Sequence, residues 1–220
     1  MVVDVRPPKA PWLPIEPEDK SGGALSFYYS DTNSNLPVRE VTRTDDNKSD
    51  PNLETMTYGL FSTCERGMRK GIVTRGIQYL FFCTNRGGIR VLTGYYKIGW
   101  YFKGPPVPGY SATGRVLDDY ALAASEGKFV TRGFPLRDLT DYLKGVRIDN
   151  RFRDFKYINQ QTAELLASLI DEAGDETQVY LEEIKRLEKL NYANHGFVYK
   201  NWERKKGFGW DMAPSYMGLS

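Results

Sequence analysis

The chain has 220 residues, of which 40% are apolar, so it can form one packed core with a small helical appendage. Charged residues make up 26% and nearly balance at a formal charge of +2, so the overall charge does not indicate a class of partner, and any preference for nucleic acid would have to come from a local patch. Two cysteines exclude a disulfide framework, and a proline-broken start without an apolar run of roughly 20 residues predicts a cytoplasmic protein with no membrane segment.

The first fifty residues are predicted to hold an arm, a strand and a long loop. Prolines recur between positions 7 and 17 and exclude a helix, so residues 1–22 form a predicted extended arm. The apolar and aromatic run at 24–29 predicts a first strand. The polar residues 30–52 predict a loop that is mobile or functional.

A β-hairpin is the clearest prediction in the centre of the chain. Residues 79–84 form a buried-type strand, a glycine-containing turn follows at 85–88, and residues 89–102 form the return strand. Alternation along the return strand places Tyr96 and Trp100 on one apolar and aromatic face. Glycines inside this strand, at 94 and 99, predict a bulge or a close backbone approach, as in a tightly curved barrel.

Shorter elements are predicted after the hairpin. A proline- and glycine-rich loop covers 103–114, two short elements follow at 120–124 and 127–130, and residues 135–143 form a short helical turn.

The last third is predicted to be helical. Thr162 is the expected cap of a helix that runs to residue 173, and Gly174 is expected to end it. The apolar stripe of this helix consists of Leu165, Leu166, Leu169 and Ile170. A second helix over 175–190 completes a helical hairpin, and an aromatic and basic tail follows. Central strands with late helices predict the α+β class.

No residue pattern indicates catalysis, and the chain is not expected to be an enzyme or to hold a metal or cofactor. His195 is the only histidine and cannot by itself supply a triad or a metal cluster. Cys64 has basic neighbours that would lower its pKa, but no base is apparent, and Cys83 is expected in the core. The acidic pair Asp118 and Asp119 is most simply explained as solvated charge.

Basic and aromatic residues are the remaining candidates for function. Basic side chains neutralise phosphates and aromatic faces stack on bases, so these residues indicate nucleic-acid binding, although composition alone favours an ordinary core and a wet surface. The expected backbone contacts are Arg66, Arg69, Lys70, Arg75 and Lys97.

The central pieces follow one another in a recognisable order: Tyr58-Gly59-Leu60-Phe61-Ser62-Thr63, a basic stretch, Tyr79-Leu80-Phe81-Phe82, a turn and Thr93-Gly94-Tyr95-Tyr96-Lys97-Ile98. This order resembles that of PUA-like barrels and, among them, the EVE and YTH domains. Residues 127–139 are similar to the closing strand and turn of those domains, and 155–160 to the ending of EVE-type domains. The resemblance covers about residues 24–170 and implies a small, curved, barrel-like mixed β-sheet with flanking helices.

The resemblance also implies recognition of DNA or RNA through a base, often modified, in an aromatic pocket. By position, Phe61 would line the pocket, where YTH domains usually have Trp, and Trp100 would supply a wall. The full set of expected ligand-binding residues is Phe61, Ser62, Thr63, Cys64, Tyr96 and Trp100. Phe at the cage position departs from the YTH pattern and weakens the case for a methyl-group cage.

The expected division is an arm over 1–22, a PUA/EVE/YTH-like barrel domain over 23–160, a helical hairpin over 161–191 packed on the barrel, and a tail over 192–220. Two other functions stay open. The chain could be a metal-dependent enzyme on nucleotides or nucleic acid, with Asp31, Asp118 and Asp119 as ligands. It could also be an interaction module, whose C-terminal region docks an effector protein or a second copy.

Overall fold

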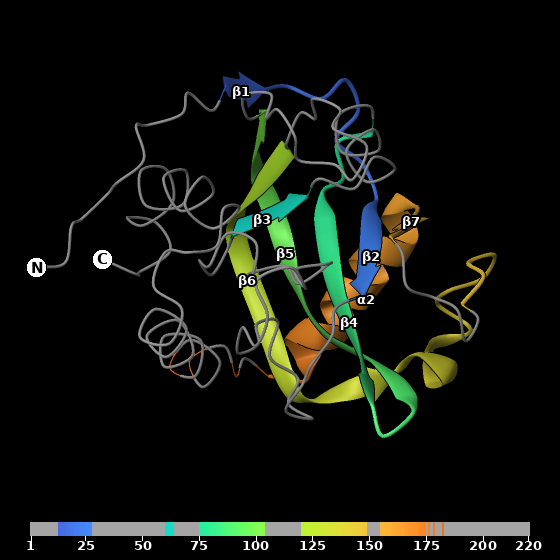
Figure 1. The fold of residues 1–220 in the computed structure, drawn as a ribbon. Coiled ribbons are helices and arrows are strands. Elements are labelled where there is room, and N and C mark those ends of the chain that lie inside the picture. The colour runs from blue at the N-terminus through green and yellow to red at the C-terminus, as the bar shows by residue number, and fades with distance from the viewer. Residues whose placement is uncertain are drawn as a thin grey trace, which may run out of the picture.

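The computed structural model describes residues 13–27, 60–63, 75–103, 120–148, 155–174, 176, 178 and 182. Its strands are β1 (Leu13–Ile15), β2 (Gly23–Phe27), β3 (Leu60–Thr63), β4 (Tyr79–Arg86), β5 (Ile89–Lys103), β6 (Tyr120–Pro135) and β7 (Lys156–Ile158). A 3-10 helix, η1 (Leu136–Leu139), follows β6, and α2 (Gln160–Glu172) follows β7. The strands form one mixed sheet with α2 packed on it (Figure 1), which confirms the α+β class.

The strand order is β3-β6-β5-β4-β2-β7, and β1 pairs with β5 outside this path. Every pairing is antiparallel except that of β2 with β4. Among the described strands the sheet is open and ends at β3 and β7, so the expected closure into a barrel is not confirmed.

The predicted hairpin is confirmed as β4 and β5, which pair as far as Arg86 and Ile89. Gly87 and Gly88 form its two-residue turn with φ angles of 55° and 82°, which side chains with a Cβ rarely adopt. Inside β5, the register shifts beside Gly94 confirm the predicted bulge. A Cβ at Gly94 would collide with the carbonyl oxygen of Lys128 and the ring of Phe129, so the close approach is also confirmed.

β6 differs from its prediction, because the two expected short elements are one strand of 16 residues. Its pairing with β5 shifts register between Lys97 and Ile98 and again before Trp100. A bulge interrupts the alternation of side chains without ending the strand, which is why the sequence looks like two elements.

α2 begins one turn earlier than the predicted cap. The Asn159 side chain caps the helix by accepting a hydrogen bond of 2.8 Å from the Thr162 backbone N–H, so Thr162 lies inside the first turn and is buried. Leu166 and Ile170 face the sheet as predicted, whereas Leu165 is 44% exposed and Ala163 and Ala167 take the remaining buried positions. Gly174 has a φ of 97° and follows the last helical turn as expected.

Both faces of the central strands are buried. On the helix face, α2 and the residues after η1 pack on a cluster that includes Leu25, Phe81 and Tyr95. On the other face Phe82, Tyr96 and Phe129 form an aromatic triangle with ring centroids 4.6–5.7 Å apart. Residues 80–84 of β4 are therefore all buried, which explains the continuous apolar run in the sequence.

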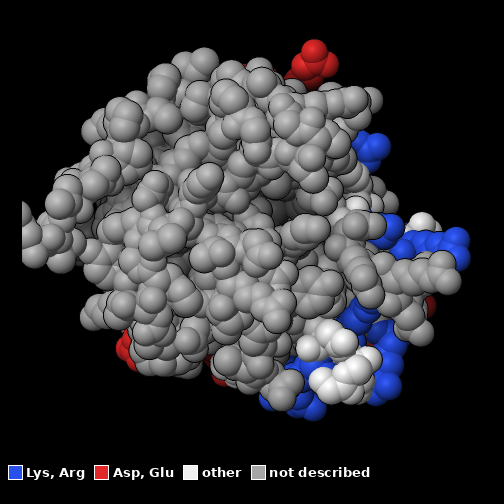
Figure 2. Space-filling model, in the orientation of Figure 1, with Lys and Arg blue, Asp and Glu red and all other residues white. Residues whose placement is uncertain are grey.

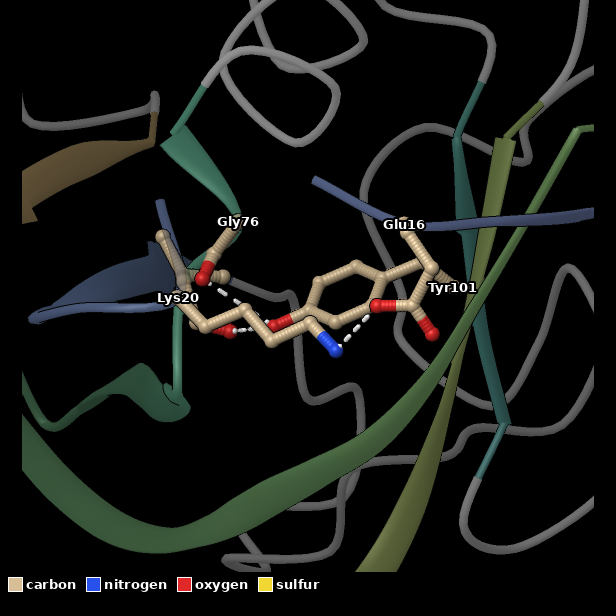
Figure 3. A network of polar contacts seen from close by, with 5 residues as sticks. Glu16, Lys20, Gly76 and Tyr101 are labelled. Carbon is tan, nitrogen blue, oxygen red and sulfur yellow. Dashed lines mark hydrogen bonds and ion pairs between the residues drawn. The ribbon is translucent and has the colours of Figure 1, made fainter. Parts of the chain in front are cut away.

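Three residues of the predicted arm, Leu13–Ile15, belong to the sheet. β1 pairs with the end of β5, and the Tyr101 hydroxyl lies 2.5 Å from the carbonyl oxygen of Ile77 and 3.0 Å from that of Gly76 (Figure 3). Lys20 forms an ion pair with Glu16, and its ammonium group lies 5.9 Å from the centre of the Tyr101 ring. Burial, and secondarily the charge of Glu16, raises the pKa of Tyr101.

The predicted second helix lies mostly outside the described residues, within which positions 178 and 182 are helical. Glu176 binds the side of β6, because its N–H donates to the carbonyl oxygen of Phe129 at 3.2 Å and its carboxylate accepts from the N–H and hydroxyl of Thr131. These hydrogen bonds lower the pKa of Glu176. Residues 30–52, 104–114 and 192–220 lie outside the described residues, and Lys103, the first residue of the second predicted loop, is the last residue of β5. No helix in the described part of the chain is long and apolar enough to span a bilayer.

Candidate nucleic-acid interface

Three of the expected pocket residues lie on β3. Phe61, Ser62 and Thr63 pair with Leu122, Ala121 and Tyr120 of β6 in antiparallel register. β3 is thus the end strand of the path, separated from β5 by β6. Cys64, Arg66, Arg69 and Lys70 lie outside the described residues.

Tyr96 has a packing position. Its side chain is 0% exposed and its ring makes edge contacts with Phe82 and Phe129. A base could touch this ring only by displacing core residues, so the structure gives Tyr96 a role in the aromatic triangle and no surface for a ligand.

Trp100 has an exposed position on the same strand. Its side chain is 45% exposed, although Tyr96 is fully buried and Ile98 nearly so. The cause is the bulge between Ile98 and Trp100, which shifts the pairing with β6 and interrupts the alternation. Of the two β5 aromatics expected at the pocket, Tyr96 is buried and Trp100 is exposed.

Lys97 lies in a charged neighbourhood that is already balanced. It is half-buried and pairs across the strands with Glu126. Nearby, Asp171 of α2 accepts a hydrogen bond of 2.8 Å from the Tyr95 hydroxyl and lies 2.9 Å from the Lys128 ammonium group. Burial and the hydrogen bond to Asp171 raise the pKa of Tyr95. This network joins α2 to β5 and β6 and is explained by that structural role.

Arg75 lies in a different part of the sheet. It is exposed, and its guanidinium group stacks over the Tyr157 ring at 4.4 Å. Tyr157 belongs to β7, which two strands separate from β5. The structure therefore does not bring together the two expected backbone contacts that it describes, Arg75 and Lys97.

A second group of cations, absent from the sequence prediction, gathers at the hairpin end of the sheet. It comes from the two sides of the β4–β5 turn, from the end of β6 and from η1 and the residues after it, which lie together at the lower right of Figures 1 and 2. We call this surface the basic end; its members are Arg86, Arg90, Arg132, Arg137, Lys144 and Arg147.

Contacts with neighbouring residues position two of these cations, Arg86 and Arg90. The Arg86 guanidinium donates to the carbonyl oxygen of Thr131 at 3.4 Å, which places it next to Arg132. Arg90 lies over the Phe27 ring at 5.2 Å. Arg90 is half-buried, and the other five side chains are exposed. In residues 84–92 and 131–148 two carboxylates, Asp138 and Asp141, oppose them. Glu176 adds a third, because its carboxylate accepts hydrogen bonds from Thr131, the residue before Arg132.

The sequence conceals the basic end because its members are spread from position 86 to position 147 and no short window is rich in them. One local signal was present, since Arg86 and Arg90 flank the predicted turn almost symmetrically. The contribution of β6 and η1 depends on the order of strands, which a charge window cannot show.

Thiol and metal chemistry find little support in the described part of the chain. Cys83 is buried on the helix face, and burial raises the pKa of its thiol, so the expected core role is confirmed. Among the described residues, no three His, Cys, Asp or Glu side chains group as metal ligands would.

Comparison with protein-family models gives no match, and comparison with curated proteins gives no similar sequence. The functional argument therefore rests on the geometry and chemistry of this chain.

Proposed function

We propose that the protein binds nucleic acid and places the phosphate backbone on the basic end of its sheet. The observation that carries the proposal is the convergence of six cationic side chains from two segments of the chain, opposed by three carboxylates, those of Asp138, Asp141 and Glu176. Arginine supplies planar, forked donors that match phosphate oxygens, and five of the six cations are arginines. The chain as a whole carries only +2, so the positive potential is local, as a binding face requires.

In its finer form, the proposal makes the described sheet part of a PUA-like domain related to EVE and YTH domains, with Trp100 stacking on a base. An exposed Trp on a bulged strand is available for stacking, and such contacts contribute about 1–3 kcal/mol per base. Trp100 lies about 35 Å along β5 from Ile89 at roughly 3.3 Å per residue. The two contacts therefore require a ligand of about ten nucleotides or more at 3.4 Å per step.

The test is fluorescence polarisation with labelled 20-nucleotide DNA and RNA, unmodified and base-modified, at two salt concentrations. Arg132→Gln removes one charge from the basic end, and Lys20→Gln removes one charge beside Tyr101 as a matched control. We expect Arg132→Gln to weaken binding to all sequences and to reduce the salt slope by about one, because each phosphate contact releases about one counterion. Lys20→Gln should leave both quantities unchanged.

Two results would contradict the proposal. The first is no binding to any oligonucleotide at low salt. The second is an equal effect of both variants, which would mean that total charge and not the basic end determines affinity. Thermal melting of each variant checks that the fold is intact.

A further inference from the structure

We propose that the tip of the β4–β5 hairpin, residues 85–90, enters the major groove of B-form duplex DNA. This inference rests on the proposed function and specifies its partner. It goes beyond phosphate binding because it assigns base contacts to residues that no sequence motif marked.

The shape of the tip fits a groove. Residues 85–89 are all exposed, and a Cβ placed on Gly87 or Gly88 would meet no atom within 4 Å. The two strands remain paired up to Arg86 and Ile89, directly beside the two-residue turn. The tip is thus a narrow ribbon that projects beyond the sheet (Figure 1), with its conformation fixed before any ligand arrives.

The side chains on the tip are of types that read base edges. Asparagine binds the adenine edge and arginine the guanine edge with two hydrogen bonds each, and an apolar side chain can contact the thymine methyl group. Asn85 and Arg86 are adjacent on β4 and so point to opposite faces of the ribbon. Ile89 pairs with Arg86, shares its face and is 38% exposed.

The other cations of the basic end are placed for phosphates. Arg132 follows Thr131, whose carbonyl oxygen accepts from Arg86, so it lies beside the ribbon and not at its tip. η1 packs against β5 and β6, and the exposed Arg137 lies on it. A ribbon in a groove has phosphate backbones on both sides, and about half or more of protein–DNA hydrogen bonds go to the backbone.

The dimensions select one kind of nucleic acid. A major groove about 12 Å wide admits a two-stranded ribbon, whereas a minor groove about 6 Å wide does not. The major groove of A-form RNA is deep and narrow, and side chains cannot read it. Single strands offer no groove. We therefore assign duplex DNA as the partner.

The first experiment compares one 20-base-pair sequence as duplex DNA, as each single DNA strand and as duplex RNA, by fluorescence polarisation at fixed salt. We expect duplex DNA to bind at least about tenfold more tightly than duplex RNA. On the DNA duplex, dimethyl sulfate footprinting should show protection of guanine N7, an atom that lies in the major groove.

The second experiment separates base reading from phosphate contact. Duplexes with ten randomised base pairs are selected with the wild type, with Arg86→Gln and with Arg132→Gln as a control of equal charge. Wild-type selection should yield a consensus that contains a guanine. Arg86→Gln should lose the preference for that guanine, with an affinity loss on the consensus of about tenfold. Arg132→Gln should weaken binding to all sequences and keep the consensus.

The outcomes distinguish this inference from the proposed function. Equal affinity for duplex RNA or single strands, or no protection of guanine N7, would overturn the hairpin assignment and leave nucleic-acid binding intact. An unchanged consensus with Arg86→Gln would do the same. No binding to any nucleic acid would overturn both. Because Arg86 is exposed, the Arg86→Gln variant should have the same melting temperature as the wild type. The Ile89→Ala variant repeats the selection experiment with a second residue on the same face of the ribbon.

Discussion

Tyr96 and Trp100 lie four positions apart on β5, and their opposite environments can be traced to a single bulge. Without the shift between Ile98 and Trp100, regular alternation would place both rings on one face. Instead Tyr96 completes the aromatic triangle with Phe82 and Phe129, and Trp100 is 45% exposed. Two aromatic residues on one strand thus differ in exposure because of a local shift in strand pairing.

Replacing each of these aromatics by alanine should therefore give different results. Tyr96→Ala removes a fully buried ring and should reduce the free energy of unfolding by about 3–5 kcal/mol, as for other large core side chains. Trp100→Ala should change the melting temperature much less and should weaken oligonucleotide binding. Thermal melting and fluorescence polarisation measure the two effects. A Trp100→Ala protein that unfolds like Tyr96→Ala would show that Trp100 is core and would remove it from the site.

At single positions, the sequence predicted packing better than binding. The apolar run around Cys83 predicts a core position, and a glycine inside a strand predicts the close backbone approach at Gly94; both predictions are confirmed. Buried positions and close backbone approaches can be predicted because each leaves a pattern in the neighbouring residues. The exposure of Trp100 depends on a register shift against β6, a strand that follows some twenty residues later. Neither the residue pattern of the strand nor the resemblance to PUA-like domains predicts this register shift.

At the scale of elements, α2 shows how the first helical turn attaches to the sheet. Asn159 caps the helix through the Thr162 N–H, and the Gln160 side chain accepts from the Gly22 N–H and donates to the Gln78 side chain at 2.7 Å. Gly22 and Gln78 directly precede β2 and β4. Asn159, which caps the helix, and Gln160, which binds residues next to the sheet, are therefore consecutive, and together they orient the first turn of α2.

Asn159→Ala should destabilise the protein by about 1 kcal/mol, because an unpaired N–H remains at the helix start. Gln161→Ala is the matched control, since this residue is exposed in the same turn. Urea unfolding should show a lower midpoint for Asn159→Ala with an unchanged slope, and no change for the control. If the two variants have equal midpoints, the cap contributes nothing to stability.

Elements with strong local signals were predicted, and their limits were predicted only in part. The hairpin, the turn after residue 135 and the first C-terminal helix all appear. Thr162 is a good capping residue and predicts a helix start, but Asn159 is a better one and immediately precedes a helix that begins at Gln160. The merging of two expected elements into β6 again reflects bulges, which interrupt periodicity but not hydrogen bonding.

At the scale of the molecule, the order of strands determines both the core and the basic end. The parallel pairing of β2 with β4 joins segments separated by more than fifty residues. This pairing places β4 between β2 and β5, and the pairing of β6 with β5 brings Arg132 beside Arg86. Pairings between distant segments leave no pattern in a single sequence. The α+β class could therefore be predicted, whereas the basic end, which depends on those pairings, could not.

Hydrogen exchange can test the order of the strands and whether the sheet closes into a barrel. β4 has strands on both sides and both faces buried, so the amides of residues 80–84 should exchange only through global unfolding. β7 is short and ends the described path, so the amides of Lys156–Ile158 should exchange faster by local opening. Exchange of β4 should accelerate with denaturant as global unfolding does, whereas that of β7 should depend little on it.

Asn159→Ala should speed β4 exchange about fivefold for a loss of about 1 kcal/mol. Equal protection of β3, β4 and β7 would contradict an open sheet, and it would be the result expected of a closed PUA-like barrel.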